Sequence, residues 1–90
     1  MNNSSTGIKK RHAEFLRILY GRYGETILNV SMSEIAKVTK NNLQTAINYM
    51  NRLEKFGYVQ IFRISTNKRR IEINSVAYNK LMQAVPTLYK

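Results

Sequence analysis

The hydrophobic residues at the start of the chain recur at helical spacing. Over residues 7–22 the apolar positions fall three and four apart, and Gly21 and Gly24 mark the end of the pattern. This spacing predicts a first helix over 7–22, which Ser5 or Thr6 could cap. Its apolar stripe consists of Ile8, His12, Phe15, Leu16, Leu19 and Tyr23.

A short strand and a short helix are predicted next. The run TILNV at 26–30 is rich in β-forming residues and indicates a brief strand whose partner comes later in the chain. Ser31 and Glu34 have the spacing of a capping box, in which each side chain satisfies a free backbone N–H of the other. They predict a helix over 32–39. We expect this helix to bury Ile35, Ala36 and Val38.

The segment 41–56 has the clearest helical period. Its apolar residues lie within about 120° on a helical wheel, and its polar residues gather on the opposite side. Gly57 is expected to end this helix. The apolar side holds Leu43, Ala46, Ile47, Met50 and Leu53, and the polar side holds Asn41, Thr45, Asn48, Arg52 and Lys55.

After Gly57 the period changes to two, which is typical of strands. The runs YVQIFRIS and RRIEIN, joined by TNK, predict a β-hairpin in which Ile71 and Ile73 share one face and Arg70 and Glu72 the other. A last helix is predicted over 75–85, where Pro86 ends it. Its apolar stripe consists of Val76, Leu81, Met82 and Val85.

This order of elements resembles the winged helix-turn-helix family of DNA-binding domains. The stretch EIAKVTKNNLQTAINYMNRLEKFGYV carries the likeness, and in it Asn42 matches the usual cap of the recognition helix. Two residues depart from the pattern, since Lys40 stands where glycine is common and Asn41 where an aliphatic residue is usual. The resemblance implies an α+β, mainly α, fold with a three-helix core, a β-hairpin wing and a C-terminal helix. It places the domain at 7–85, between a flexible N-terminus at 1–6 and a tail at 86–90.

Composition narrows the function classes. Fifteen Lys and Arg residues face five Glu and no Asp, which gives a net charge of +10 and favours a polyanionic partner. The chain has no cysteine and one histidine, so neither a metal site nor an enzyme with a nucleophile and base is expected, and no cofactor is implied. His12 is interpreted as a residue packed in the core or at its edge rather than as a metal ligand. No apolar run is long enough to span a membrane, and a cytoplasmic protein is expected.

The resemblance assigns candidate DNA-binding residues to two elements and their surroundings. Amide side chains can pair with adenine in the major groove, and cations bind phosphate or enter a narrow, A·T-rich minor groove. On the recognition helix the candidates are Asn41, Asn42, Gln44, Thr45, Asn48 and Arg52. On the wing, over 63–70, they are Arg63, Thr66, Asn67, Lys68, Arg69 and Arg70. Further phosphate contacts are assigned to Lys40, Tyr49 and Lys55.

Two points on this surface have alternatives. Leu43 and Ile47 stand where the family presents base-reading residues. There are three alternatives for these two side chains: they pack in the core, they contact thymine methyl groups, or they face a partner chain. We favour packing in the core. The cations at the hairpin either bind DNA or protect an edge strand from aggregation. The wing is also hypothesised to supply more affinity than the recognition helix, because no Lys or Arg lies between Lys40 and Arg52.

The expected function is sequence-specific binding of double-stranded DNA by a small transcription regulator. The apolar surface of the last helix, which includes Tyr78, predicts a homodimer; the alternative is that this surface closes the core of the monomer. Alternatives are an accessory DNA-binding protein of a plasmid or phage, acting in replication, partition or conjugative transfer, and an RNA-binding module. No membrane partner or small-molecule ligand is expected.

Overall fold

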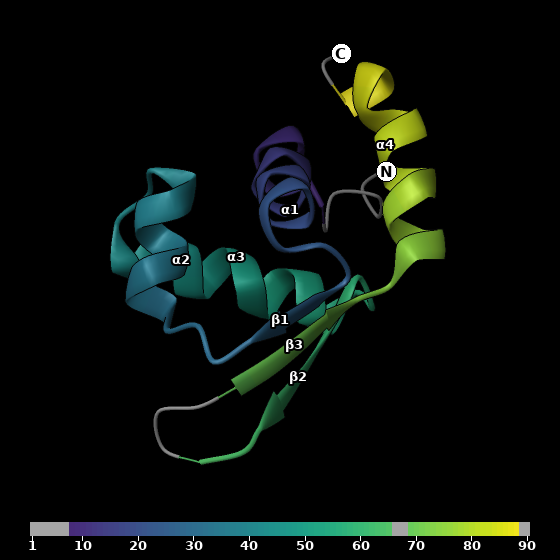
Figure 1. The fold of residues 1–90 in the computed structure, drawn as a ribbon. Coiled ribbons are helices and arrows are strands. Elements are labelled where there is room, and N and C mark those ends of the chain that lie inside the picture. Colours follow the sequence, from purple (N-terminus) through teal and green to yellow (C-terminus); the bar gives the residue numbers. More distant parts are fainter. Residues whose placement is uncertain (1–7, 66–68, 89–90) are drawn as a thin grey trace.

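The computed structural model describes residues 8–65 and 69–88, in which four helices and three strands form an α+β, mainly helical fold (Figure 1). The predicted fold class is confirmed at this level. The elements are α1 (Lys10–Tyr23), β1 (Thr26–Leu28), α2 (Met32–Thr39), α3 (Leu43–Lys55), β2 (Val59–Arg63), β3 (Arg69–Ile73) and α4 (Ser75–Leu88).

Helix α1 begins at Lys10, three residues later than predicted. The backbone N–H of Lys9 donates a hydrogen bond to His12 Nδ1 over 3.0 Å, so a side chain inside the helix satisfies the group at its start. At the other end Gly24, with φ 78°, accommodates a conformation that costs other residues strain. The predicted capping residues Ser5 and Thr6 lie outside the described residues.

Helix α2 has the predicted limits. Ser31 Oγ accepts a hydrogen bond from the Glu34 N–H over 3.1 Å, which is one half of the predicted capping box. Lys40 ends the helix in the left-handed conformation, with φ 60°, which glycine adopts without strain. The prediction for Val38 was wrong, because it is only half-buried while the hydroxyl-bearing Thr39 is buried.

The three strands form one antiparallel sheet in the order β1-β3-β2, so the last strand in sequence is the central one. Ile27 and Ile61 both lie opposite Ile71, and Val59 lies opposite Ile73. The predicted strand in TILNV and its late partner are confirmed. Figure 1 shows the helices on one side of this sheet, and the strand alternation turns Ile71 and Ile73 toward them, where both are buried.

Helix α1 forms the centre of the core, since it contacts α2, α3 and α4. Its residues Phe15, Leu16 and Leu19 are almost completely buried, and each such side chain stabilises the fold by about 1.5–3 kcal/mol relative to exposure. His12 is 6% exposed, so the interpretation as a core residue is confirmed. The core therefore fixes α3 against α1 on one side and against the sheet on the other.

Helix α4 differs from its prediction in two respects. It continues through Pro86 to Leu88, because the fixed φ of proline suits a helix and its missing N–H costs one hydrogen bond close to the end. Val76 is 66% exposed, so its place in the apolar stripe was wrong. Tyr78 stacks on Tyr20 of α1 with ring centroids 4.2 Å apart, whereas the side chain of Val85 lies outside the described part.

Candidate nucleic-acid interface

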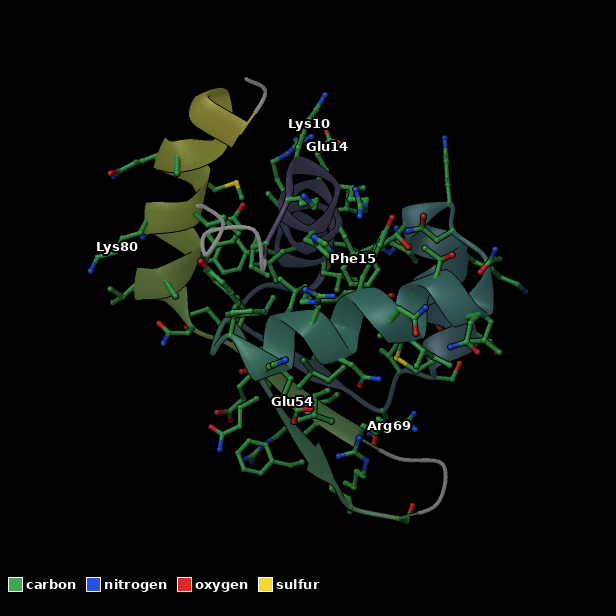
Figure 2. The ribbon with its side chains drawn as sticks, turned by 180° about the vertical axis from the view of Figure 1, so that it is seen from behind. Lys10, Glu14, Phe15, Glu54, Arg69 and Lys80 are labelled. Carbon is green, nitrogen blue, oxygen red and sulfur yellow. The ribbon has the colours of Figure 1, made fainter. Side chains whose placement is uncertain are left out.

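Helix α3 presents a polar face to solvent. Ala46, Met50 and Leu53 bury one side of the helix, and Gln44 and Asn48 on the opposite side are exposed. Figure 2 shows α3 lying across the near side of the molecule. The predicted polar face is therefore present over the length of the helix, although α3 spans Leu43–Lys55 rather than 41–56.

The two asparagines before α3 have structural partners. Asn42 is the N-cap, and its Oδ1 accepts a hydrogen bond from the Thr45 N–H over 2.8 Å. Asn41 is half-buried in the preceding turn, where its Nδ2 donates to Thr39 Oγ1 over 3.0 Å. The expectation that Asn42 caps this helix is confirmed. The placement of Asn41 on the helix was wrong, because its role in the turn holds it before the first helical residue.

One hydrogen bond orients the central amides of α3. Gln44 Nε2 donates to Asn48 Oδ1 over 3.0 Å, as residues four apart on a helix can. The bond leaves the Gln44 carbonyl oxygen as an acceptor and the Asn48 amide nitrogen as a donor. These two groups complement the N6 donor and the N7 acceptor that adenine displays in the major groove. Thr45 beside them is half-buried.

The hairpin separates its arginines onto two faces. Arg63 and Arg69 lie directly opposite one another across β2 and β3, on the same face as Ile61 and Ile71. This face turns toward α3, and Figure 2 shows Arg69 beside that helix. Neither side chain makes an ion pair or a side-chain hydrogen bond to any residue that the structure describes.

Arg70 points to the other face of the sheet and has partners there. Its Nε lies 3.2 Å from Glu72 Oε2, and its guanidinium carbon lies 4.6 Å from the centroid of the Phe62 ring. The Nε atom is buried and makes no hydrogen bond within the described part, so the carboxylate contact is an ion pair only. Arg69 and Arg70, which the sequence assigns to the same wing, therefore lie on opposite faces of the sheet, because neighbouring strand residues face opposite ways.

A groove of about 310 Å³ runs between α3, the start of α2 and the inner face of the hairpin. Leu43 is 46% exposed at its edge, and Ile47 is half-buried inside it. The preference for placing both in the core was therefore wrong for Leu43 and only partly right for Ile47. Six of the residues that line the groove are Met32, Leu43, Ile47, Ile61, Arg63 and Arg69.

The three residues assigned as further phosphate contacts, Lys40, Tyr49 and Lys55, lie in different surroundings. Lys40 is exposed in the turn before α3, and Lys55 is exposed at the far end of the helix, 5.9 Å from the Phe56 ring centroid. Tyr49 packs edge-on against His12 and Phe15, with ring centroids 4.9 Å and 5.5 Å away. Its ring therefore serves the contact between α1 and α3.

His12 is a buried imidazole whose pKa is lowered mainly by its burial. Burial lowers its pKa from 6.5 to about 4, with smaller contributions from the charges of Arg11, Arg52 and Lys9. The imidazole is neutral at pH 7 and accepts the Lys9 N–H through Nδ1. The charge of Arg52 on α3 therefore acts on His12 of α1. Arg52 also has an interaction of its own within the molecule.

Acidic residues are scarce between the turn before α3 and the middle of β3. Between Lys40 and Ile71 the only acidic residue is Glu54, which Figure 2 shows at the end of α3. The wing candidates Thr66, Asn67 and Lys68 lie outside the described residues. Sequence reasoning missed Met32 and Asn51, which line the groove together with the arginines. Asn51 could have been found, because it lies between the polar and the apolar side of α3 on a helical wheel.

The described residues contain neither a group of three His, Cys, Asp or Glu side chains suited to a metal ion nor a helix long and apolar enough to cross a membrane. No protein-family model, curated protein or solved structure matches this chain.

Proposed function

We propose that this chain is a winged-helix protein that binds double-stranded DNA in a sequence-specific manner as a small transcription regulator. Helix α3 enters the major groove, and the hairpin acts as the wing on phosphate or in the minor groove. One observation carries the proposal: Arg63 and Arg69 lie opposite each other, without an acidic partner in the described part, and line a groove together with Leu43 and Asn51 of α3.

The dimensions of α3 support this placement. Thirteen residues make a helix about 20 Å long, and the major groove, about 12 Å wide, admits one helix. Because Gln44 and Asn48 are joined by a hydrogen bond, little side-chain freedom is lost when they meet a base edge. We assign them the reading of an adenine.

The hairpin arginines supply the affinity that does not depend on sequence. Each cation that neutralises a phosphate releases condensed counterions, so binding weakens as salt rises. Two like charges directly opposite across strands destabilise a free protein, and a nearby phosphate strand removes that cost. The wing is therefore expected to be the main source of DNA affinity, and Arg63 and Arg69 are expected to contribute most of it.

The proposal is tested first by comparing nucleic acids. Selection from a random duplex pool should recover A·T-containing sites, and labelled duplexes should bind more tightly than RNA hairpins at matched salt, as measured by fluorescence anisotropy. Tighter binding to the RNA hairpins would reject the DNA assignment and favour an RNA-binding module.

Base readout by α3 is tested with a matched pair of double variants. Gln44→Ala/Asn48→Ala should lower discrimination between selected and unrelated duplexes by about 1–3 kcal/mol. Asn42 is left intact, because removing this N-cap would also cost about 1 kcal/mol of stability. The control is Asn79→Ala/Gln83→Ala, an exposed amide pair with the same spacing on α4. Equal loss in both double variants would contradict readout by α3.

Self-association stays a prediction. Tyr78 and Met82 pack against the core of their own chain and Leu81 is buried in it, so a homodimer through α4 has to use other residues of that helix. In a two-fold dimer, recovered half-sites should lie about 34–36 Å apart, one turn of the duplex. Sites recovered singly, without a repeat at that spacing, would argue for binding as a monomer.

A further inference from the structure

The groove beside the hairpin has the chemistry of a small-molecule site. Its walls are mostly apolar, with Leu43 and Ile47 on α3 and Ile61 on β2, and two guanidinium groups stand at one end. Its volume of about 310 Å³ is at the lower end of the range for ligand sites, which are commonly apolar with a few convergent polar groups.

Two features of the groove are unfavourable for the free protein. Leu43 leaves 46% of its surface exposed, although the position opens a helix whose exposed residues are otherwise polar. Arg63 and Arg69 hold like charges directly opposite each other across two strands, which is destabilising. A ligand that carries one anionic group and an apolar body would relieve both costs together.

We propose that this groove binds an amphipathic monocarboxylate with an unbranched apolar chain, of the class of medium-chain fatty acids. The carboxylate accepts hydrogen bonds from Arg63 and Arg69, since guanidinium groups match the two oxygens of a carboxylate. The chain lies along Ile61, Ile47 and Leu43 and removes their exposed apolar surface from water.

Binding of such a carboxylate regulates the DNA contact. Arg63 and Arg69 cannot neutralise a phosphate while they hold the carboxylate, so the ligand lowers affinity for duplex DNA by competition. The ligand site itself goes beyond the proposed function, whereas the competition rests on it. The two parts are therefore tested separately.

The ligand site is tested without DNA, with decanoate as the probe. Titration followed by calorimetry and by the NMR signals of the Met32 and Ile47 methyl groups should show saturable binding of one decanoate per chain. Acetate, which lacks the chain, and decanol, which lacks the charge, should each bind at least about tenfold more weakly, because each retains only one of the two recognition elements.

Variants separate the groove from general attraction to a basic protein. Arg63→Gln/Arg69→Gln should weaken decanoate by about tenfold or more, and Leu43→Gln, at an exposed position, by several-fold. The charge-matched control Arg17→Gln/Lys80→Gln should leave binding unchanged; both residues are exposed, and Figure 2 shows Lys80 on α4, away from Arg69.

Several results would overturn the ligand site. These are equal binding of decanol, a loss in the Arg17/Lys80 control as large as in the Arg63/Arg69 variant, or no saturable shift of the two methyl signals. Competition is measured by adding decanoate to a bound, labelled duplex, and release of the duplex is expected. If decanoate binds but the duplex stays in place, the ligand site stands and the placement of DNA on these arginines fails.

Discussion

The two faces of the β2–β3 hairpin carry arginines with opposite surroundings. On the inner face, Arg63 and Arg69 lie opposite each other at the edge of a groove and have no acidic partner in the described part. On the outer face, Arg70 is held by Glu72 and covered by Phe62. The three arginines of the hairpin therefore divide into two whose charges are not paired within the described part and one whose charge is paired within the protein.

The difference shows that the number of cations near a hairpin tip does not by itself measure what the hairpin can bind. Strand alternation assigns each residue to a face, and the neighbours on that face decide whether its charge is already neutralised. A double substitution of Arg69 and Arg70 would remove one arginine from each face at once. Substituting Arg63 and Arg69 together, and Arg70 separately, tests each face by itself.

The largest expected effect concerns the apolar part of the inner face. Ile71 is 1% exposed and lies opposite both Ile27 and Ile61, so Ile71→Ala should lower the free energy of unfolding by about 2–5 kcal/mol, because it removes buried surface and leaves a cavity. Urea denaturation measures the change. The control Ile64→Ala, at a residue 63% exposed, should change stability by less than about 0.5 kcal/mol. Similar costs at both positions would contradict the assignment of the faces.

The second prediction concerns His12, whose pKa is lowered by burial and, to a smaller extent, by the neighbouring cations. Its pKa is about 4 in the fold and 6.5 when unfolded, so the unfolded state binds the extra proton between these values. The stabilising contribution is complete above about pH 6.5 and is lost as pH falls toward 4. At about 1.36 kcal/mol per pKa unit, the whole difference is worth about 3 kcal/mol.

The measurement is urea denaturation at pH 7.5 and pH 4.5 of the natural chain and of His12→Asn, whose Oδ1 can still accept the Lys9 N–H. The natural chain should lose about 2–3 kcal/mol more than the variant over this interval. Since the glutamates are the same in both chains, their titration cancels in the comparison. Equal losses would mean that His12 is protonated as easily in the fold as in the unfolded chain.

The smallest expected effect concerns the outer face. Phe62→Leu removes the ring beneath Arg70 and should cost less than about 1 kcal/mol of stability, because the contact is partly exposed to solvent. Duplex affinity should stay within about twofold of the natural chain. A loss of DNA binding on this substitution would place the outer face in the interface and remove the contrast between the two faces.

Much of the fold could be predicted because local signals and tertiary packing agree. Ser31 and Glu34 fixed the start of α2, and the alternation of Ile71 and Ile73 with Arg70 and Glu72 indicated the faces of β3 correctly. The start of α1 could not be predicted, because His12 caps it from inside the helix. The extension of α4 beyond Pro86 was equally inaccessible, since proline is a strong but not absolute stop.

The candidate site was only partly predictable. The polar face of α3 follows from helical period, and Gln44 and Asn48 lie on it. The cap role of Asn42 was also expected and is confirmed. The role of Asn41 in the turn was not, because it depends on where the helix begins, and boundaries are the weakest part of pattern reasoning. The groove could not be foreseen, because it arises where α2, α3 and the hairpin meet in space.

The most direct test of the central claim is the salt dependence of duplex binding for the two groups of arginines. Arg63→Gln/Arg69→Gln should lower affinity by roughly 10- to 100-fold and reduce the slope of log affinity against log salt by about two, one for each phosphate that is no longer neutralised. Arg70→Gln and the control Arg17→Gln/Lys80→Gln should leave both quantities nearly unchanged. Losses per charge that are equal across the three variants would contradict the account, because they would show attraction to net charge rather than to the inner face of the hairpin.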